Sequence, residues 1–561
     1  MCSIDKKFMR KAEMYDIGDS SVRSLTRDKA WLHTLPCASV AIDGSQPLSG
    51  IINMITLQRG CGILLHITSL PSRYGIGDLG QGAYDFIDFL AAAGQKYWQI
   101  LPIGPVSSIF HNSPYMSLAA FAGNPLFVSP EKLVEDGYLS QDDLAGHPDF
   151  SQFLVEFDNV VPFKIRLLEK AFQKFIDTNS SGAFETFCQT TNWLDDYAIF
   201  MAIKEDQDQR PWNLWPRDLA SRDQQAINGC RQRLSERILY HKFVQFCFFQ
   251  QWQRLHQYAT DKGISLIGDI PIYVAFDSVD VWAHQECYKL HSKTLAPKYV
   301  AGVPPDYFSE TGQRWGNPIY RWTIDKLKVN EPLYLWWQER FKNIFQLVDV
   351  IRIDHFRGFE TYWEIPAEEE YAIKGRWVKG PGRSFFMHMA RKIGALPIIA
   401  EDLGELTPEV EKMREDTGFP GMKILHFAFD SDEKNLYLPH NFETTNCVVY
   451  TGTHDNDTTL GWHFDPDVPE TSKEKARRYA KSDGSLIHWD FIEMAFASIA
   501  GVAIIPLQDI LGFGNDCRMN KPSTTTGNWL WRCAPQFLTE EVQTRLLNET
   551  IFYNRYNNRS T

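Results

Sequence analysis

The chain has 561 residues, more than the ~250–300 at which a single hydrophobic core usually stops growing, which argues against one simple domain without insertions. Hydrophobic residues make up 44% of the sequence and charged residues 23%, which excludes intrinsic disorder over most of its length. The net charge of −13 argues against a cationic footprint, so we expect neither nucleic acid nor an anionic membrane surface as the main partner.

Aromatic residues reach 14% of the chain, a content that suits flat neutral ligands such as sugars but also fills cores. The ten cysteines are scattered without a CxxC pair, which is typical of reduced thiols in a cytosolic protein and not of a disulfide framework or zinc site. The most apolar stretch, residues 494–507, is too short for a membrane-spanning helix. We therefore predict a soluble, cytoplasmic protein.

The first 58 residues show no sustained hydrophobic period, and we interpret residues 1–58 as a poorly ordered, dispensable N-terminal extension. A plastid location would require this segment to be a transit peptide, which its several acidic residues disfavour. The ordered pattern begins at Arg59, and we predict one catalytic domain over residues 59–561.

Eight short apolar runs of strand length follow in this domain, at residues 62–67, 97–103, 265–274, 349–356, 397–403, 421–429, 448–454 and 502–511. Most are nearly continuous, which is typical of strands buried on both faces of a parallel sheet. Helical stretches separate them; in residues 82–94, Ala83, Phe86 and Leu90 share one face. We predict an α/β fold, a (β/α)8 TIM barrel of eight strand–helix units.

The spacing of these runs predicts two large insertions. A helical insertion occupies residues of about 104–262, after the second run, and an active-site loop insertion occupies about 275–348, after the third. The second contains a loop rich in Gly and Pro at residues 302–318. Both insertions follow the carboxyl end of a strand, the barrel face on which active sites are built.

Polar side chains recur at the carboxyl ends of the apolar runs: Asp269, Arg352, Asp354, Glu401, Asp402, His454, Asp455 and Asp509. A carboxylate in so apolar a setting is costly unless it is hydrogen-bonded, paired or used in chemistry. A single such acid is ordinarily a structural acceptor. Several at the same end of consecutive strands favour an active site built from carboxylates.

The expected distance between two of these carboxylates indicates which reaction mechanism the site supports. Asp354 and Glu401 follow sequential strands, which lie ~4.8 Å apart in a parallel sheet. Retaining glycosidases hold two carboxyl groups ~5–5.5 Å apart, whereas inverting enzymes leave ~6.5–9.5 Å, so a covalent glycosyl-enzyme is favoured. Arg352 shares a face with Asp354 and favours the ionised carboxylate of a nucleophile. Three apolar residues precede Glu401, a setting that raises the pKa of an acid.

Three segments resemble the catalytic segments of the 4-alpha-glucanotransferases, also called amylomaltases or disproportionating enzymes, glycoside hydrolase family 77 of the α-amylase clan. They are Arg352-Ile-Asp-His-Phe-Arg357, Ile399-Ala-Glu-Asp-Leu-Gly404 and Thr451-Gly-Thr-His-Asp-Asn456. Further similar segments are Gly62-Ile-Leu-Leu-His66, Asn112-Ser-Pro-Tyr115, Gly268-Asp-Ile-Pro-Ile-Tyr273 and the 302–318 loop. The similarity runs from about residue 59 to residue 532 in the family's order, with Ile67 standing where the family pattern has Pro.

The resemblance implies that Asp354 is the nucleophile, Glu401 the general acid/base and Asp455 the third carboxylate. It further implies substrate contacts from Arg352, His454, Asn456, Asp269, Ser113 and Tyr115, and from Asp306, Glu310 and Trp315 in the loop that this family folds over the glucan. It implies no cofactor and no metal. Donors would be maltooligosaccharides and α-1,4-glucans, and acceptors would be glucose or maltooligosaccharides.

The predicted function is retaining transfer of an α-1,4-glucan segment to the 4-hydroxyl of an acceptor sugar. One alternative is a metal-dependent barrel hydrolase that uses His66, His355, His454, Asp269 and Glu401. Others are an α-glucan hydrolase without net transfer and a non-catalytic glucan-binding barrel.

Two local questions concern side-chain direction. His355 should face away from Asp354 and serve structure, and Trp315 has an alternative reading as an ordinary packed ring. His454 and Asp455 both serve the site only if the chain turns or bulges between them.

Overall fold

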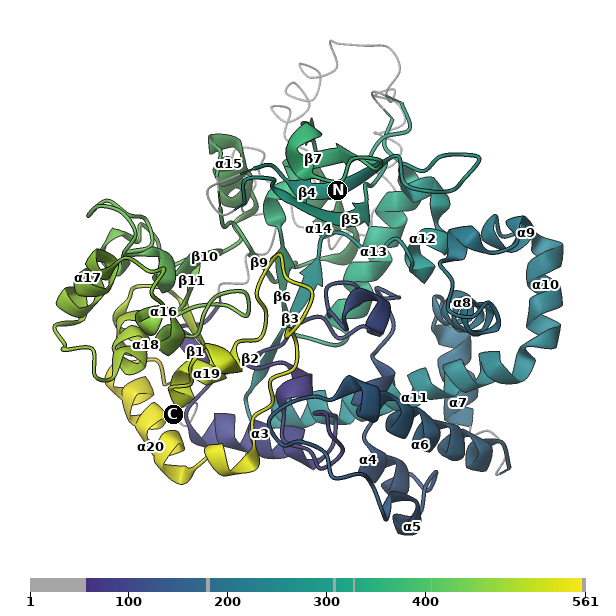
Figure 1. Ribbon diagram of the computed structural model, residues 1–561, viewed down its shortest axis with the longest axis horizontal. Helices are drawn as coiled ribbons and strands as arrows, with labels where there is room; N and C mark the ends of the chain where they lie inside the picture. Colours follow the sequence, from purple (N-terminus) through teal and green to yellow (C-terminus); the bar gives the residue numbers. More distant parts are fainter. Residues whose placement is uncertain (1–56, 178–181, 306–308, 326–327, 405, 557–561) are drawn as a thin grey trace, which may run out of the picture.

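A computed structural model describes residues 57–177, 182–305, 309–325, 328–404 and 406–556 (Figure 1). The extension predicted over residues 1–58 therefore lies almost wholly outside the described residues. Eight strands form one parallel sheet: β1 Gly60–Leu64, β2 Tyr97–Gln99, β3 Ser265–Pro271, β6 Val350–Asp354, β9 Ile398–Ala400, β10 Gly421–Ile424, β11 Cys447–Tyr450 and β12 Val502–Pro506. Their order is β10-β11-β12-β1-β2-β3-β6-β9.

The two end strands of this order meet, because the Ala400 amide donates a hydrogen bond to the Pro420 carbonyl at 2.9 Å. Each of the eight predicted runs overlaps one of these strands, and the (β/α)8 barrel is confirmed. β1 is buried along its whole length, as expected for a strand covered on both faces. At Gly62 a Cβ atom would lie 2.2 Å from the Tyr97 carbonyl, so the β1–β2 approach requires glycine.

Helices cover the outside of the barrel. The chain connects successive strands through α3 Gln81–Ala92, α11 Ser235–Asp261, α13 Glu331–Phe345, α14 Arg383–Ile393 and α15 Pro408–Thr417, and α16 Thr459–Phe464, α17 Glu470–Ala480 and α18 Ile487–Ala497 precede β12. α15 illustrates the local signals: Pro408 opens its first turn and Gly418, with φ 72°, ends it in the left-handed conformation.

The expectation of eight strand–helix units is wrong at one connection. Residues 425–446 join β10 to β11 through two 3-10 turns, Leu425–Phe427 and Pro439–Asn441, in place of an α-helix. The last predicted run is also longer than its strand, because β12 is followed at once by α19 Leu507–Leu511. Asp509 therefore lies on a short helix in which Leu507 and Ile510 remain buried, so the run of apolar residues continues past the strand.

The predicted helical insertion lies between β2 and β3, on the right of Figure 1. It comprises α4 Pro130–Glu135, α5 Gln141–Leu144, α6 Phe157–Asp177, α7 Gly182–Thr190, α8 Leu194–Asp206, α9 Arg217–Ala220 and α10 Gln224–Arg233, and continues into α11. A buried ion pair joins it to the loop after β3, with Lys204 Nζ 2.5 Å from Asp277 Oδ2. The Asp277 carboxylate also accepts the Trp212 amide at 3.1 Å.

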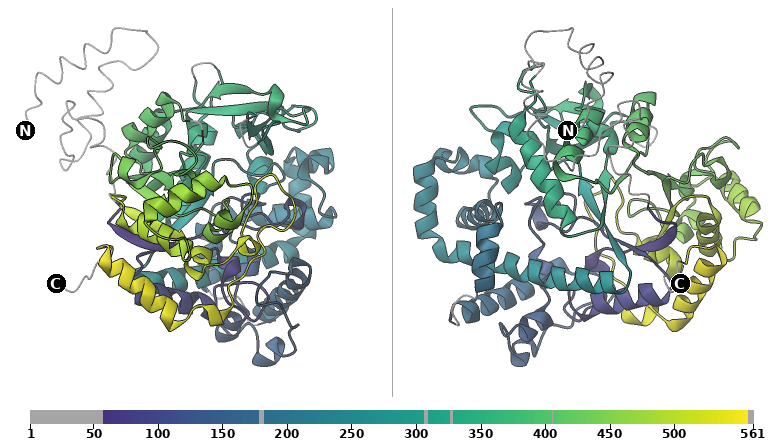
Figure 2. Two further views of the ribbon diagram at one scale, coloured as in Figure 1. Left: turned by 60° about the vertical axis from the view of Figure 1, so that its left-hand side comes forward. Right: turned by 180° about the vertical axis from the view of Figure 1, so that it is seen from behind.

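A second, antiparallel sheet lies at the top of Figure 1 and is seen from another side in Figure 2. Its order is β5-β4-β7-β8, with β4 Tyr299–Val303, β5 Gln313–Pro318, β7 Thr361–Pro366 and β8 Arg376–Lys379. β4 and β5 belong to the predicted loop insertion, which also holds α12 Val279–Ala283. β7 and β8 follow β6 and form a third insertion, which the sequence analysis missed.

The aromatic content serves the core to a large extent. Trp98, Trp212, Trp252, Trp282 and Trp337 are among the largest fully buried side chains. The C-terminal helix α20 Glu540–Phe552 packs beside α3 and α18. Within the described part of the chain, no helix combines the length and apolar character needed to span a membrane.

Replacement of Lys204 by Met should destabilise the protein by about 3–5 kcal/mol, because it leaves the Asp277 carboxylate buried and unpaired. Lys374→Met, which removes the exposed partner of Glu369, should change the free energy of unfolding by less than about 1 kcal/mol. Urea denaturation of the two variants tests this; equal losses would contradict the structural role assigned to the buried pair.

Candidate active site

Neighbouring strands bring the predicted carboxylates together at one end of the barrel. In the β3–β6 register Asp269 is opposite Arg352, and in the β6–β9 register Ile353 is opposite Ala400. Asp354 and Glu401 each follow by one residue, and the Glu401 amide donates to the Ile353 carbonyl at 3.1 Å. The two acids therefore stand at equivalent positions of adjacent strands, as the sequence predicted.

The buried Arg352 guanidinium links two of these carboxylates. Its Nη1 lies 2.7 Å from Asp269 Oδ2, and its Nη2 lies 3.0 Å from Asp354 Oδ1. The expected contact within β6 is thus present. The Asp354 side chain keeps 30% of its surface exposed at the barrel mouth, whereas Asp269 and Arg352 are buried. Asp354 is consequently the ion-paired carboxylate that a bound molecule can reach.

Glu401 lies in a different electrostatic setting. Its carboxylate oxygens accept backbone hydrogen bonds from His355 at 2.7 Å and Leu403 at 2.8 Å. Burial raises the pKa of Glu401 to about 7; the charge of Arg352 opposes this rise and that of Asp354 adds to it. Such a group holds a proton up to neutral pH, as a general acid requires.

Asp269 is the buried partner of this arrangement. Burial raises the pKa of Asp269 above its ordinary range, while the adjacent Arg352 opposes the shift. Its Oδ2 accepts the Tyr115 hydroxyl at 2.9 Å as well as Arg352, and its Oδ1 has no hydrogen-bond partner among the described residues. Tyr115, Asp269, Arg352 and Asp354 form one continuous chain of polar contacts.

The chain turns after β11, as His454 and Asp455 require to serve one site. β11 ends at Tyr450, and His454 Nε2 lies 3.3 Å from Asp455 Oδ2. The neighbouring Asn456 accepts hydrogen bonds at Oδ1 from the amide and hydroxyl of Thr453, both at 2.9 Å. Asn456 therefore stabilises the turn in this structure, besides lining the adjacent pocket.

Three residues of a loop near the C-terminus complete this side of the site, and the sequence analysis missed them. Asn520 Nδ2 donates to Asp455 Oδ1 at 2.6 Å, and Arg518 donates to the Asp455 carbonyl and pairs with Asp457. Trp529 holds a left-handed backbone, φ 65°, with its ring 5.9 Å from that of Tyr115. α19 separates this loop from the end of β12, so its residues do not stand at a strand end and carried no positional signal.

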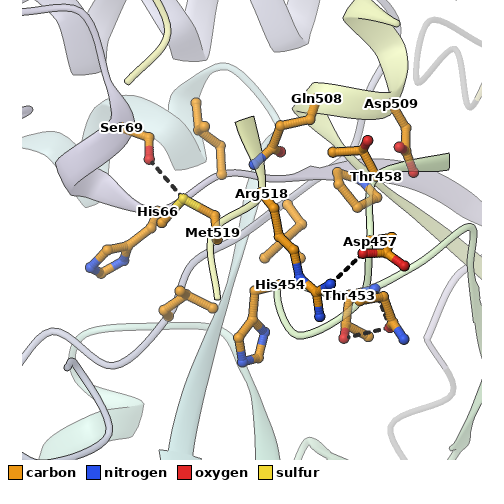
Figure 3. Close-up of a pocket in the computed structure, with 15 residues that line it drawn as sticks. His66, Ser69, Thr453, His454, Asp457, Thr458, Gln508, Asp509, Arg518 and Met519 are labelled. Atoms are coloured by element: carbon orange, nitrogen blue, oxygen red, sulfur yellow. Dashed lines mark hydrogen bonds and ion pairs between the residues drawn. The ribbon is translucent and has the colours of Figure 1, made fainter. Parts of the chain in front are cut away.

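Tyr115 forms an aromatic wall together with His454. Their rings stack at 5.1 Å with an interplanar angle of 12°. Ser113 shapes the same turn, since its Oγ accepts the Tyr115 amide at 3.3 Å. Figure 3 shows the pocket next to this wall, which His454, His66 and Arg518 line. His66 Nδ1 is buried there without a described hydrogen-bond partner.

The loop predicted to cover the substrate is described in part. Asp306 lies outside the described residues. Glu310 is exposed in the turn before β5. Trp315, on β5, is half-buried and packs edge-on against His355 at 4.8 Å. Trp315 thus packs as an ordinary ring, directly beside the strand end that carries Asp354, and its contact with substrate stays a prediction.

The remaining acids predicted at strand ends have structural partners. Asp402 accepts the Met422 amide at 2.7 Å, and Asp509 accepts the Thr459 amide at 2.6 Å. His355 holds Glu401 through its backbone amide, consistent with the structural role expected for it. Across the described ranges, no three His, Cys, Asp or Glu side chains are arranged to hold a metal ion.

The family model for 4-alpha-glucanotransferase, glycoside hydrolase family 77, matches residues 65–539 of this chain. The chain belongs to this family. Among its relatives, the 4-alpha-glucanotransferase of Synechocystis is 48% identical over 506 residues, which are 89% of this chain and 98% of the relative. The Thermus thermophilus 4-alpha-glucanotransferase is 44% identical over 503 residues, 87% of this chain and 98% of the relative.

A solved structure of an amylomaltase has the same fold as this chain. The amylomaltase from Streptococcus agalactiae, in complex with acarbose, aligns with a TM-score of 0.84 at 39% identity and covers 89% of this chain and 100% of its own. The expected membership of the 4-alpha-glucanotransferase family is confirmed.

Asn520→Ala should reduce kcat for maltotriose in this 4-alpha-glucanotransferase while leaving KM and thermal stability nearly unchanged. A hydrogen bond to a charged acceptor contributes about 1.5–3 kcal/mol, so the loss should be roughly ten- to hundredfold. Asn446→Ala is the matched control, because Asn446 Nδ2 donates to the Gly418 carbonyl at the opposite end of β11. Equal kcat values in the two variants would contradict the positioning of Asp455 by Asn520.

Proposed function

We propose that this protein is a 4-alpha-glucanotransferase that moves an α-1,4-glucan segment from a donor chain to the 4-hydroxyl of an acceptor sugar, with retention of configuration. The observation that carries the mechanism is the placement of Asp354 and Glu401 at equivalent positions of adjacent strands. At the ~4.8 Å spacing of parallel strands, no room remains for a water molecule between carboxylate and sugar.

In the first step, an Asp354 carboxylate oxygen bonds to the anomeric carbon of the donor sugar. The bond from that carbon to the glycosidic oxygen breaks, and the protonated Glu401 gives its proton to the departing oxygen. In the second step, Glu401 takes the proton from the acceptor 4-hydroxyl, whose oxygen displaces Asp354. Two inversions at the same carbon restore the α configuration, and both carboxyl groups regain their starting states.

The surrounding groups support these roles. Arg352 holds Asp354 by an ion pair at 3.0 Å and thereby orients the attacking oxygen. Asp455, held by Asn520, is the carboxylate we assign to the sugar hydroxyls beside the reacting carbon. The stacked Tyr115 and His454 rings supply an aromatic face for the donor, with Asp269 and Ser113 beside it.

Transfer requires that an acceptor compete with water. Water at about 55 M outnumbers an acceptor at about 1 mM, so the site must favour the sugar hydroxyl by about 6 kcal/mol. Trp315 lies beside the Asp354 strand end and can hold an acceptor ring there, which raises the effective concentration of its hydroxyl. We assign Asp306 and Glu310 to the same acceptor side, and glucose or maltooligosaccharides as acceptors.

Incubation with maltotriose tests this function directly. We expect glucose and a ladder of longer maltooligosaccharides with little net gain in reducing ends. Trp315→Ala should raise the ratio of hydrolysis to transfer, whereas Tyr371→Ala, which removes an exposed ring between β7 and β8, should leave the ratio unchanged. Predominant hydrolysis by the unaltered protein would refute the transferase and leave an α-glucan hydrolase.

Two substitutions separate the roles of the paired acids. Asp354→Asn should abolish turnover yet retain glucan binding, because the covalent step loses its nucleophile. Glu401→Gln should be nearly inactive with maltotriose but should still accumulate a covalent adduct from α-glucosyl fluoride, since fluoride leaves without a proton. Intact-protein mass spectrometry measures the adduct. A covalent glucosyl adduct on Asp354→Asn, or the absence of an adduct on Glu401→Gln, would contradict the roles assigned to the two acids.

The raised pKa of Glu401 predicts the alkaline limb of the pH profile. An acid whose pKa lies near 7 stays protonated at lower pH, so kcat/KM for maltotriose should decline above about pH 7. With α-glucosyl fluoride the same limb should be absent, because its first step needs no acid. Identical alkaline limbs for both donors would show that another group controls them.

A further inference from the structure

The turn directly after the Asp354 strand has an unusual backbone. His355 follows β6 and adopts the left-handed conformation, with φ 54° and ψ 49°. Any residue with a side chain is disfavoured there, because its Cβ comes too close to the following carbonyl oxygen. A left-handed residue other than glycine beside an active site points to a function for the backbone geometry itself.

The hydrogen bonds between β6 and β9 show what this turn does. The Ile353 carbonyl accepts the Glu401 amide at 3.1 Å. In a regular parallel ladder, the Glu401 carbonyl would in turn accept the amide of His355, two residues beyond Ile353. It accepts the Phe356 amide instead, at 3.1 Å. The ladder is therefore displaced by one residue at the point where β6 ends.

This displacement frees the His355 amide to bind the side chain of Glu401. The amide donates to Glu401 Oε2 at 2.7 Å. An extra residue with a left-handed backbone in a strand pair redirects the groups at a strand end in this way. Two consecutive amides of one turn thus hold Glu401, one at its carboxyl group and the other at its backbone carbonyl.

The His355 ring stabilises the turn by packing and not by charge. It lies edge-on against the Trp315 ring, with 4.8 Å between centroids and an interplanar angle of 88°. Gly358 leaves room for it, because a Cβ at that position would lie 3.0 Å from His355 Cδ2. Burial lowers the pKa of His355 to about 3, so the ring is uncharged at neutral pH. Replacement of the ring therefore removes no charge from the site.

We propose that His355 is a positioning residue for the general acid and acts through its left-handed backbone, which lets one turn hold the Glu401 carboxyl group in place for proton transfer. This inference rests on the proposed function for the role of Glu401. Side chains that accept the left-handed conformation should support acid catalysis, and side chains that oppose it should not. The attack by Asp354 is not assigned to this turn.

Two substitutions of similar size separate the backbone of His355 from its ring. His355→Asn and His355→Thr both remove the ring and leave a small polar side chain. Asparagine adopts the left-handed conformation readily, whereas the β-branched threonine opposes it. Lys481→Thr is the matched control, because Lys481 ends α17 in the same conformation, φ 56°, at an exposed position on the left of Figure 1.

We expect kcat/KM for maltotriose to fall roughly ten- to hundredfold in His355→Thr and to recover to within about threefold in His355→Asn. The alkaline limb of the pH profile should move to higher pH in His355→Thr, because loss of an amide hydrogen bond to the ionised carboxylate raises the pKa of Glu401. Adduct formation from α-glucosyl fluoride, which needs no acid, should stay within about threefold of the unaltered rate. Lys481→Thr should lower thermal stability and leave both reactions unchanged.

Equal losses of maltotriose activity in His355→Asn and His355→Thr would overturn the proposal, because the ring would then matter and not the backbone. An equally large loss of adduct formation would also overturn it, because the turn would then serve Asp354 or the fold. If His355→Thr does not fold, His355→Gly and His355→Ala give the same comparison with a difference of one methyl group. The alanine variant should be the less active with maltotriose, and equal activities would overturn the proposal.

Failure of the proposed function would appear in a different measurement. Glu401→Gln that forms no adduct from α-glucosyl fluoride would refute the role of Glu401 itself. If Glu401→Gln does form the adduct, the comparison of the His355 variants tests the positioning role alone.

Discussion

The buried guanidinium of Arg352 is the interaction on which the site depends. It lies between Asp269 and Asp354, with Glu401 on the next strand. Three carboxylates at the end of one barrel would repel one another and lose hydration together. A single permanent cation among them offsets part of both costs. The β3–β6–β9 register supplies this arrangement, because it places Asp269, Arg352 and Glu401 on consecutive strands.

Asp354 and Glu401 carry the same functional group but differ in their contact with the Arg352 guanidinium. Asp354 receives the direct ion pair and remains partly exposed, which suits attack on a sugar carbon. Glu401 receives two backbone amides and no direct ion pair with Arg352, and burial keeps its proton to higher pH. Because their surroundings differ, two carboxylic acids of one site can serve as the nucleophile and as the general acid.

The insertions and loops supply side chains around the site that the barrel strands do not carry. The segment after β2 supplies Tyr115, whose hydroxyl reaches Asp269, and the antiparallel sheet presents Trp315 beside His355. The loop near the C-terminus holds Asp455 through Asn520. Substrate positioning is thus distributed over segments far apart in the sequence, while bond cleavage is assigned to two adjacent strands.

The sequence predicted the parts of the structure that depend on local pattern. Buried parallel strands read as apolar runs, so all eight were found, and the residues after them marked the barrel mouth. Other parts depend on distant partners. β7 and β8 are half-exposed strands whose pairing with β4 lies beyond any local signal. Asn520 is one of many loop amides, and only the folded chain brings it to Asp455. Asp402 and Asp509 resembled site residues, yet both cap backbone amides.

The central claim is that Asp354 and Glu401 act from adjacent strands through a covalent intermediate, and the configuration of the first product tests it most directly. Proton NMR during early turnover of maltotriose distinguishes the anomers before mutarotation mixes them. A covalent intermediate on Asp354 requires that the newly formed glycosidic bond, and any sugar released to water from that intermediate, has the α configuration. A product initially formed as the β anomer would require attack by water or acceptor without the covalent step and would contradict the account.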